Sequence, residues 1–358
     1  MRRYIQDAVA RAASQAHMDS GETAFFIREL ETIEARTYDV KYPDLKARRL
    51  LSMGSGLSPA SEYLTWRQFD RQGSVAEASM ETDEIPLVDV KGREFQSKVI
   101  SVVVGYDYTT QDIRAAMAAG RPLDAMKAFA ARELVERKFE KLAAVGSDFV
   151  ALNSVYGLLN QPNIPIIGVS ADSTTTSGYT ALATGAANSN AVLTWGPDAG
   201  GYTKTPKEII RDLNSWFNQV QKLTNGVEAP DTLLLDLVSY NYINTTQVND
   251  ADASIFTEGT ILSYIMRNLS WLKSVDFWLA CDKSMTGTGP GTHGSTSKFR
   301  ALLYKKSPEN LSMFIPQEFE QFAPQLVNFK FRIPCHARFG GVVCRYPRSA
   351  VYIDGLQP

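Results

Sequence analysis

Residues 289–294 read Gly-Pro-Gly-Thr-His-Gly, which is the glycine spacing of a turn that binds the pyrophosphate of a dinucleotide. Such a turn needs a strand before it and a helix after it, because the N–H groups at the start of the helix hold the phosphates. The residues that follow predict a strand instead, and Pro290 lies between the first two glycines. We therefore interpret the segment as a flexible loop. A nucleotide-using enzyme is the least supported of the functions considered for this chain.

The cysteines and histidines are the other residues whose chemistry could indicate a site. Cys335, His336 and Cys344 are near one another in the sequence, but their spacing matches no zinc-binding pattern and all three lie in strand-like runs. We interpret them as small buried residues. His17 lies in the N-terminal region and His293 in the glycine-rich loop, which leaves few candidates for histidine-based catalysis. The sequence therefore predicts no catalytic, cofactor-binding or metal-ligating residue.

The longest helical signal runs from Thr110 to Gly146 and predicts an element against which others pack. A short helix is predicted over Thr110–Ala119 and a long one over Pro122–Val145, which Gly146 would end. At 1.5 Å per residue the long helix measures roughly 36 Å. Its apolar residues recur every three or four positions and so share one face: Ala128, Ala131, Val135, Phe139, Leu142 and Val145.

Residues 63–108 change from a helical to a strand-like period. Two strands are predicted, over 65–73 and 93–108, joined by a polar connection that contains the acidic residues of 77–84. We interpret the acidic segment as a solvated tip, with a divalent-cation site as the alternative. A two-stranded ribbon is at best marginally stable in water unless a third surface covers its apolar face. That surface belongs either to the rest of the chain or to another copy of it.

The N-terminal region contains little that could fold alone. Residues 1–20 have a short Ala-rich amphipathic pattern. Thr23–Met53 combines a helical period around Phe26 and Leu30 with an extended piece broken by proline. We interpret the whole region as an arm that lies across another surface.

Residues 160–310 alternate between helix and strand, which predicts an α/β or α+β subdomain. Thr205, Pro206 and Glu208 form a capping box that starts a helix ending near Gly226. After it we expect a strand over Asp231–Leu237, a helix over Phe256–Leu272, and strands over Val275–Cys281 and residues 299–306. From Asn310 onward the pattern is mostly that of strands.

The bulk composition is that of a folded protein without a strong charge. The 358 residues carry a formal net charge of −2, so no global positive field attracts nucleic acid or an anionic membrane. The local basic cluster of Lys46, Arg48 and Arg49 is interpreted as a solvated face, or as one that pairs with another subunit. Three cysteines form no disulfide framework. We see neither a signal peptide nor an apolar run of about 18 residues, and expect a soluble protein made inside the cell.

The order of these segments resembles that of the major capsid proteins of tailed bacteriophages, which have the Hong Kong 97-type fold. The resemblance covers nearly the whole chain, and order and spacing carry it rather than a catalytic motif. The residues concerned are FFIRELETIEARTYDVKYPDLKARRLL (Phe25–Leu51), EIPLVDVKGREF (Glu84–Phe95), YDYTTQDIRAAMAAGRPLDAMKAFAARELVERKFEKLAAVG (Tyr106–Gly146), VYGLLNQP (Val155–Pro162) and RFGGVVCRYPRSAVYIDG (Arg338–Gly355).

The resemblance implies an α+β capsid fold with an N-terminal arm, an extended two-stranded loop, a long spine helix, and peripheral and axial domains. The expected segments are the arm over 1–60, the extended loop over 61–108, the peripheral domain with the spine helix over 109–160, the axial domain over 161–310, and C-terminal strands returning to the peripheral domain over 311–358. Several relatives begin with a scaffolding-like segment that is removed during maturation. This chain has no room for one before its arm, so we expect a separate scaffolding protein.

The function that the resemblance implies is structural, not enzymatic. We expect a subunit that assembles with copies of itself, as pentamers and hexamers, into an icosahedral head around double-stranded DNA, which it contacts non-specifically. The other expected partners are scaffolding, portal and cement proteins, without a membrane or a cofactor. The expected location is the virion, after assembly in the cytoplasm of the host bacterium. The alternative is an encapsulin-type compartment, with the same fold and a protein cargo.

Contacts between subunits are predicted where the arm and the ribbon cannot bury their apolar faces alone. The ribbon resembles the extended loop that lies over a neighbouring subunit in this family. The residues predicted at these contacts are Phe26, Leu30, Trp66, Phe69, Glu81, Glu84, Lys91, Arg93 and Phe95. Some relatives join this loop to a neighbour by a lysine–asparagine isopeptide bond. Lys91 and Lys98 lie in the ribbon, but no asparagine or acid can be named as a partner, so no such bond is predicted.

Overall fold

The chain divides into two compact units, Met1–Asp44 and Leu45–Pro358. The computed structural model describes residues 42–75, 77, 87–119, 123–147, 155–169, 172–173, 191–192, 195, 204–248, 259–282 and 300–356. All the helices and strands below belong to the second unit. The predictions for residues 1–41 of the arm, including those for Phe26 and Leu30, fall outside the described residues.

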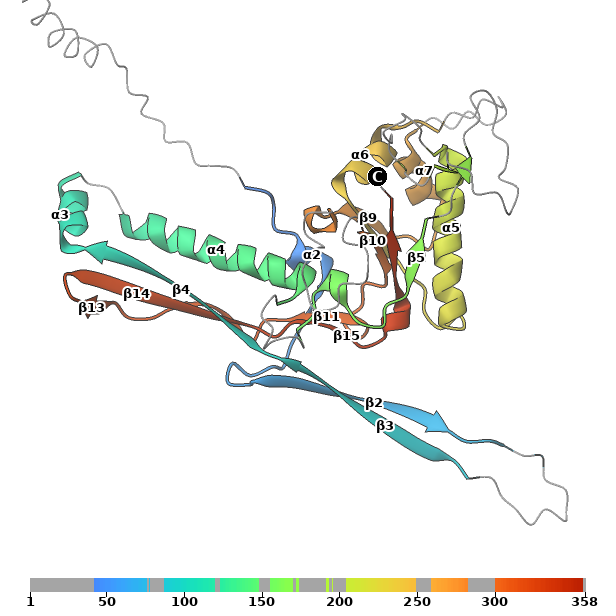
Figure 1. Cartoon of the computed structure of the whole chain (residues 1–358), viewed down its shortest axis with the longest axis horizontal. Helices are drawn as coiled ribbons and strands as arrows, with labels where there is room; N and C mark the ends of the chain where they lie inside the picture. Colours follow the sequence, from blue (N-terminus) through green and yellow to red (C-terminus); the bar gives the residue numbers. More distant parts are fainter. Residues whose placement is uncertain are drawn as a thin grey trace, which may run out of the picture. The chain divides into compact units, whose positions relative to one another are not determined.

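Two consecutive helices follow the long strand β4 (Ile100–Thr109), as Figure 1 shows. They are α3 (Thr110–Ala119) and α4 (Leu123–Val145), so the predicted bounds are confirmed to within one residue. Most of the predicted apolar stripe is buried, namely Ala131, Val135, Phe139, Leu142 and Val145. Helix α4 is therefore the spine of this part of the molecule, roughly 35 Å long.

Helix α4 ends where the chain turns back onto it. Gly146 has a φ of 81°, and its amide donates to the carbonyl of Leu142. A β-carbon at Gly146 would lie 2.3 Å from the carbonyl oxygen of Val155. Glycine is required here both for the positive φ and for this close approach. The end of α4 thus packs directly on the segment that contains the short 3-10 helix Leu158–Asn160.

Helix α4 lies on a sheet whose two longest strands are far apart in the sequence (Figure 1). Strand β4 pairs antiparallel with β14 (Lys330–Phe339), which also pairs with β12 (Gln317–Gln321) and β13 (Gln325–Val327). The prediction of a single strand over 93–108 is wrong. Residues 89–98 form a separate strand that pairs elsewhere, and only β4 joins β14.

A first hydrophobic core fills the space between α4, the sheet of β4 and β14, and a three-stranded sheet. The small sheet consists of β1 (Ser52–Gly54), β11 (Leu311–Phe314) and β15 (Val342–Cys344). Phe139 of α4 stacks on Phe339 of β14, with ring centroids 5.5 Å apart. This contact joins the spine to the sheet at the centre of the core.

A five-stranded sheet forms the second half of the unit. Its order is β5 (Ile166–Gly168), β16 (Ala350–Asp354), β10 (Arg300–Tyr304), β8 (Thr232–Leu235) and β9 (Ser274–Phe277). The three central strands are buried along nearly their whole length, so they are continuous apolar runs rather than alternating ones. A separate small pair joins Asp172–Ser173 to Ala191–Val192.

Successive residues of the central strands enter different cores. In β10, Leu302 and Tyr304 belong to the core shared with α4, whereas Ala301 and Leu303 belong to a second core. This alternation follows from the two-residue period of a strand. The second core is closed by three helices, α5 (Pro206–Leu223), α6 (Leu237–Thr245) and α7 (Ile261–Asn268), which Figure 1 shows beside the sheet.

The start of α5 confirms the predicted capping box. The Thr205 hydroxyl accepts the amide of Glu208 at 3.4 Å, and the Glu208 carboxylate accepts the amide of Thr205 at 2.8 Å. Helix α6 was not predicted. Residues 231–237 were interpreted as one strand, but Asp236 ends that strand and caps α6 by accepting the amides of Val238 and Ser239.

Two further boundaries differ from the sequence-based expectation. The strand predicted over Val275–Cys281 ends at Phe277, and Leu279–Cys281 forms a 3-10 turn instead. The last strand, β16, pairs with β10 and β5 and so lies in the five-stranded sheet. Residue 310 therefore does not separate the strands of the two sheets, although the division into domains stays a prediction.

Candidate functional site: an uncovered β-ribbon

The predicted ribbon is a two-stranded sheet, β2 (Tyr63–Gln72) and β3 (Asp89–Lys98), paired antiparallel along its whole length. Within the described part of the chain neither strand pairs with a third. In Figure 1 the ribbon extends away from the helices and sheets of the unit. Nearly all of its side chains are exposed or half-buried. Beyond its base, both faces and both edges of the ribbon are therefore left open by the described residues.

One face of the ribbon carries four of the predicted contact residues. Trp66 is paired with Phe95, and further along the same face Arg93 lies opposite Gln68 and Lys91 lies opposite Asp70. The rings of Trp66 and Phe95 stack with centroids 5.7 Å apart and an interplanar angle of 17°. This face therefore has an aromatic base and a polar, charged end.

Phe69 lies on the opposite face, because side chains alternate along a strand. Its ring covers Gly92, where an added β-carbon would lie 3.1 Å from it. Phe69 is 67% exposed, and Val90, diagonally across from it, is 56% exposed. Tyr63 adds a third exposed apolar side chain to this face. Sequence reasoning missed Tyr63 and Val90, although their even-numbered spacing from Phe69 and Gly92 could have indicated them.

The charged residues of the ribbon form only exposed contacts. Arg67 and Glu94 are directly opposite one another and pair at 3.2 Å. Such a pair contributes about 0.2–1 kcal/mol, because water screens it and two long side chains must be ordered. The charges therefore favour correct pairing of the strands but do not hold the ribbon against the unit.

Exposed apolar residues lie just beyond the far ends of both strands. Val75 and Leu87, which flank the connection, are almost fully exposed. Glu81 and Glu84, which were predicted at subunit contacts, lie outside the described residues. Glu77 is described and exposed.

A second uncovered surface lies on the sheet of β4 and β14. Val102 and Val104 pack against the core, whereas Val103 between them is 74% exposed. Val103 lines a shallow hollow of about 540 Å³ together with Phe322, Arg332 and His336, among others. Sequence reasoning missed this surface, because it depends on the pairing of β4 with β14.

The N-terminal half of α4 also exposes large apolar side chains. Phe129 is 70% exposed, and Met126 and Leu134 are exposed as well. These residues are not part of the predicted buried stripe. The sequence could therefore have indicated them as apolar residues on the solvent-facing side of the helix. Exposed apolar surface of this kind marks sites of contact with other proteins.

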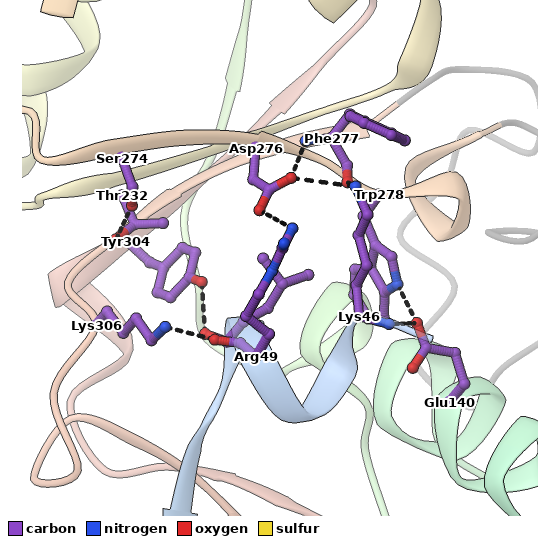
Figure 2. Close-up of polar contacts among 11 residues, drawn as sticks. Lys46, Arg49, Glu140, Thr232, Ser274, Asp276, Phe277, Trp278, Tyr304 and Lys306 are labelled. Atoms are coloured by element: carbon purple, nitrogen blue, oxygen red, sulfur yellow. Dashed lines mark hydrogen bonds and ion pairs between the residues drawn. The ribbon is translucent and has the colours of Figure 1, made fainter. Parts of the chain in front are cut away.

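The basic cluster of Lys46, Arg48 and Arg49 was interpreted as solvated or as pairing with another subunit. Arg48 and Arg49 are indeed exposed, but all three residues have partners within the chain. The three residues lie at the short helix α2 (Ala47–Leu50) and pair within the chain. Arg48 binds Glu136 and Glu318, at 2.9 and 2.8 Å. Lys46 and Arg49 both pair with one carboxylate, that of Asp276, as Figure 2 shows.

The residues considered for catalysis do not form a reactive site among the described residues. Cys281 and Cys335 are buried and Cys344 is half-buried, and burial raises the pKa of each thiol, so that none is a ready nucleophile. His336 lies beside the ring of Phe322. The segment 289–294, His17 and His293 fall outside the described part.

Neither a metal-binding cluster nor a membrane-spanning helix occurs among the described residues. No group of three or more His, Cys, Asp or Glu side chains is placed so that it could hold a metal ion. No described helix combines the length and the apolar character that crossing a membrane requires.

Comparison with known protein families gives a match over most of the chain. A family model described as major capsid protein matches residues 75–356, which is more than half of the chain. No match was found among curated protein sequences.

Several solved structures are similar in fold. The capsid of Myoviridae phage XM1 has a TM-score of 0.72 at 14% identity, over 92% of this chain and 98% of that one. The structure from Mycobacterium phage Ogopogo has a TM-score of 0.54 at 11% identity, over 93% and 98%. The capsid of cyanophage P-SCSP1u has a TM-score of 0.55 at 13% identity, over 92% and 93%. At these identities the likeness concerns the fold.

Proposed function

The chain belongs to the major capsid protein family, and on this premise we propose that it assembles as pentamers and hexamers into an icosahedral head enclosing double-stranded DNA. As a member of this family it is a structural subunit of a capsid, with the Hong Kong 97-type fold, and its place is the virion.

The uncovered ribbon is the observation that carries this proposal. A ribbon of two strands is marginal in water, yet β2 and β3 keep Phe69, Val90 and Phe95 exposed. A neighbouring copy that covered these side chains would remove apolar area from water on every subunit. Many such contacts, repeated by symmetry, close a shell without any single strong interface. The predicted contact residues Trp66, Lys91 and Arg93 lie on the same ribbon.

The domain assignment is part of the proposal. We assign the arm to residues 1–60, the extended loop to 61–108, the peripheral domain with α4 to 109–160, the axial domain to 161–310, and the returning strands to 311–358. Two hydrophobic cores, one around α4 and one around α5, support a division into peripheral and axial parts. The position of β16 in the five-stranded sheet adds one strand of the last segment to the axial part.

The proposed partners are further copies of the chain, packaged DNA, and scaffolding, portal and cement proteins, with assembly in the host cytoplasm. A formal net charge of −2 favours retention of DNA by enclosure over tight binding to phosphates. The proposed role is structural, without an enzymatic activity. An encapsulin-type compartment is not favoured, because the matched family and the similar structures are those of capsid proteins.

A shortened ribbon tests the proposal. Replacing residues 67–94 by Asn-Gly leaves Trp66 joined to Phe95 through a two-residue hairpin turn, so the stacked base of the ribbon is kept. We expect this variant to melt like the full chain but to form no shells by sedimentation and electron microscopy. The matched control is the double variant Arg67→Ala, Glu94→Ala, which removes only an exposed ion pair and should assemble.

The two parts of the proposal fail separately. Closed shells from the shortened variant would contradict the role of the ribbon. Particles of the full chain, made during infection, that hold protein cargo and no nuclease-protected DNA would contradict the proposed contents of the shell.

A further inference from the structure

Helix α2 is held at its start by a single carboxylate from the spine (Figure 2). Glu140, on α4, accepts the backbone amides of Lys46 and Ala47 at 2.9 and 2.8 Å. The same carboxylate accepts the indole N–H of Trp278, just beyond β9, at 2.6 Å. One side chain therefore joins the start of α2, the C-terminal part of the spine and the edge of the five-stranded sheet.

The carboxylate of Asp276, on β9, holds the basic side chains of the same helix. It pairs with Lys46 at 3.2 Å and with Arg49. The Lys46 ammonium also donates to the carbonyl of Phe277 at 2.8 Å and lies 3.0 Å from the centroid of its ring. Both Lys46 and Asp276 are mostly buried, so water screens this pair less than the ion pairs of the ribbon.

The last carbonyls of α2 are also bound by side chains from the sheet region. The Tyr304 hydroxyl donates to the carbonyl of Leu50 at 2.8 Å, and Lys306 donates to that of Arg49. These carbonyls have no partner within so short a helix. Both ends of α2 are therefore satisfied by side chains from distant parts of the chain.

A helix of four residues does not form on its own, because nucleation is unfavourable and tertiary contacts must supply its stability. The apolar part of those contacts is small. Ala47, Leu50 and Leu51 are the buried residues of the segment, and they lie in the core around α4. Release of α2 would expose these three side chains but would leave the α4 stripe and the second core in place.

We propose that Lys46, Arg49, Glu140, Asp276 and Trp278 form a clamp, the α2 clamp, with Glu140 as its positioning residue. The compact unit begins at Leu45. The clamp therefore anchors the first residues of this unit to the spine and to the five-stranded sheet at once. It opens as a local unit while both cores stay folded. The clamp involves no contact between subunits, so its test is independent of the proposed assembly.

Hydrogen exchange of the full-length chain tests the clamp. Glu140→Gln keeps the size of the side chain but removes the charge that binds three N–H donors, and charge-assisted hydrogen bonds are about twice as strong as neutral ones. We expect the amides of residues 45–51 to exchange roughly tenfold faster, with unchanged exchange in α5 and an unchanged melting temperature. Asp276→Asn, which leaves Glu140 intact, should accelerate the same amides.

The matched control is Glu133→Gln, which removes an ion pair with Arg137 on the same helix. It should leave residues 45–51 unchanged. Equal exchange of residues 45–51 in Glu140→Gln and the unsubstituted chain would overturn the proposal. So would faster exchange of α5 in parallel, or failure of both variants to fold, since either would show that α2 is not separable from the cores.

Discussion

Trp66 and Phe95 face one another across the ribbon and stack with their ring centroids 5.7 Å apart. They are the one stacked aromatic pair between β2 and β3 in the described part of the chain. A stacked pair adds about 0.5–1.5 kcal/mol beyond its buried area, which is a large share of the stability of an isolated two-stranded sheet.

We therefore expect Phe95→Ala to loosen the ribbon in the unassembled subunit. The loss should be about 1 kcal/mol, seen as faster hydrogen exchange of β2 and β3, with an unchanged melting temperature for the cores. Gln96→Ala, one residue further along the same strand, is the control. Equal exchange of the ribbon in both variants would show that the stack does not hold the strands together.

The two faces of the ribbon should contribute unequally to assembly. Phe69 is the most exposed aromatic side chain of the ribbon, and full burial of a phenylalanine side chain is worth about 1.5–3 kcal/mol. Phe69→Ser should therefore raise the protein concentration needed for shell formation by roughly tenfold or more. Lys91→Gln, on the opposite face, should raise this concentration less. An exposed ion pair between Lys91 and a neighbouring subunit would be worth about 1 kcal/mol at most. Light scattering over a concentration series measures both, and the reverse order would contradict this expectation.

The second core contains a fully buried ion pair, Lys204 and Asp212, with 2.6 Å between Nζ and Oδ2. The Trp195 indole N–H also donates to this carboxylate, at 3.4 Å. Asp212→Leu alone removes this carboxylate from the buried lysine charge, so the free energy of unfolding should fall by about 3–5 kcal/mol. The double variant Lys204→Met, Asp212→Leu should lose much less. Urea unfolding followed by tryptophan fluorescence measures the coupling, and additive losses would contradict it.

The pairing of Arg48 with Glu318 predicts a specific dependence of stability on pH. The hydrogen bond from Arg48 lowers the pKa of Glu318 below its ordinary value of 4.5. A lowered pKa means that the stabilisation is fully present above pH 4.5 and is lost as the pH falls through the folded-state pKa. The carboxylate is partly exposed, so the effect should be at most about 1 kcal/mol.

We expect the unfolding free energies of the unsubstituted chain and Glu318→Gln to differ at pH 7 and to converge below pH 4.5. Urea unfolding at a series of pH values measures this difference. A gap between the two proteins that stayed constant down to pH 3 would show that the pair does not act through ionisation.

Local signals in the sequence were sufficient for most of the helices. The capping box of Thr205 and Glu208 and the glycine stop at Gly146 are short-range features, and both were predicted correctly. Helix α6 was missed because Asp236 ends a buried strand and caps the helix at the same position, so the apolar run continues across the boundary. The existence of a ribbon also followed from its period, and its exposed aromatic residues could be named.

The pairing of distant segments could not be read from the sequence. Residues 93–108 look like one strand, yet β3 pairs with β2 while β4 pairs with β14, which follows more than two hundred residues later. In the same way, the basic residues of α2 find their carboxylates on α4, β9 and β12.

The composition and periods of the chain therefore determined its elements and its exposed ribbon. Only the tertiary structure decided which residues of the two strands lie opposite one another and which charges are paired. The physical reason is that strand register and ion pairing depend on contacts between residues that are remote in sequence, and a local pattern carries no information about its distant partner.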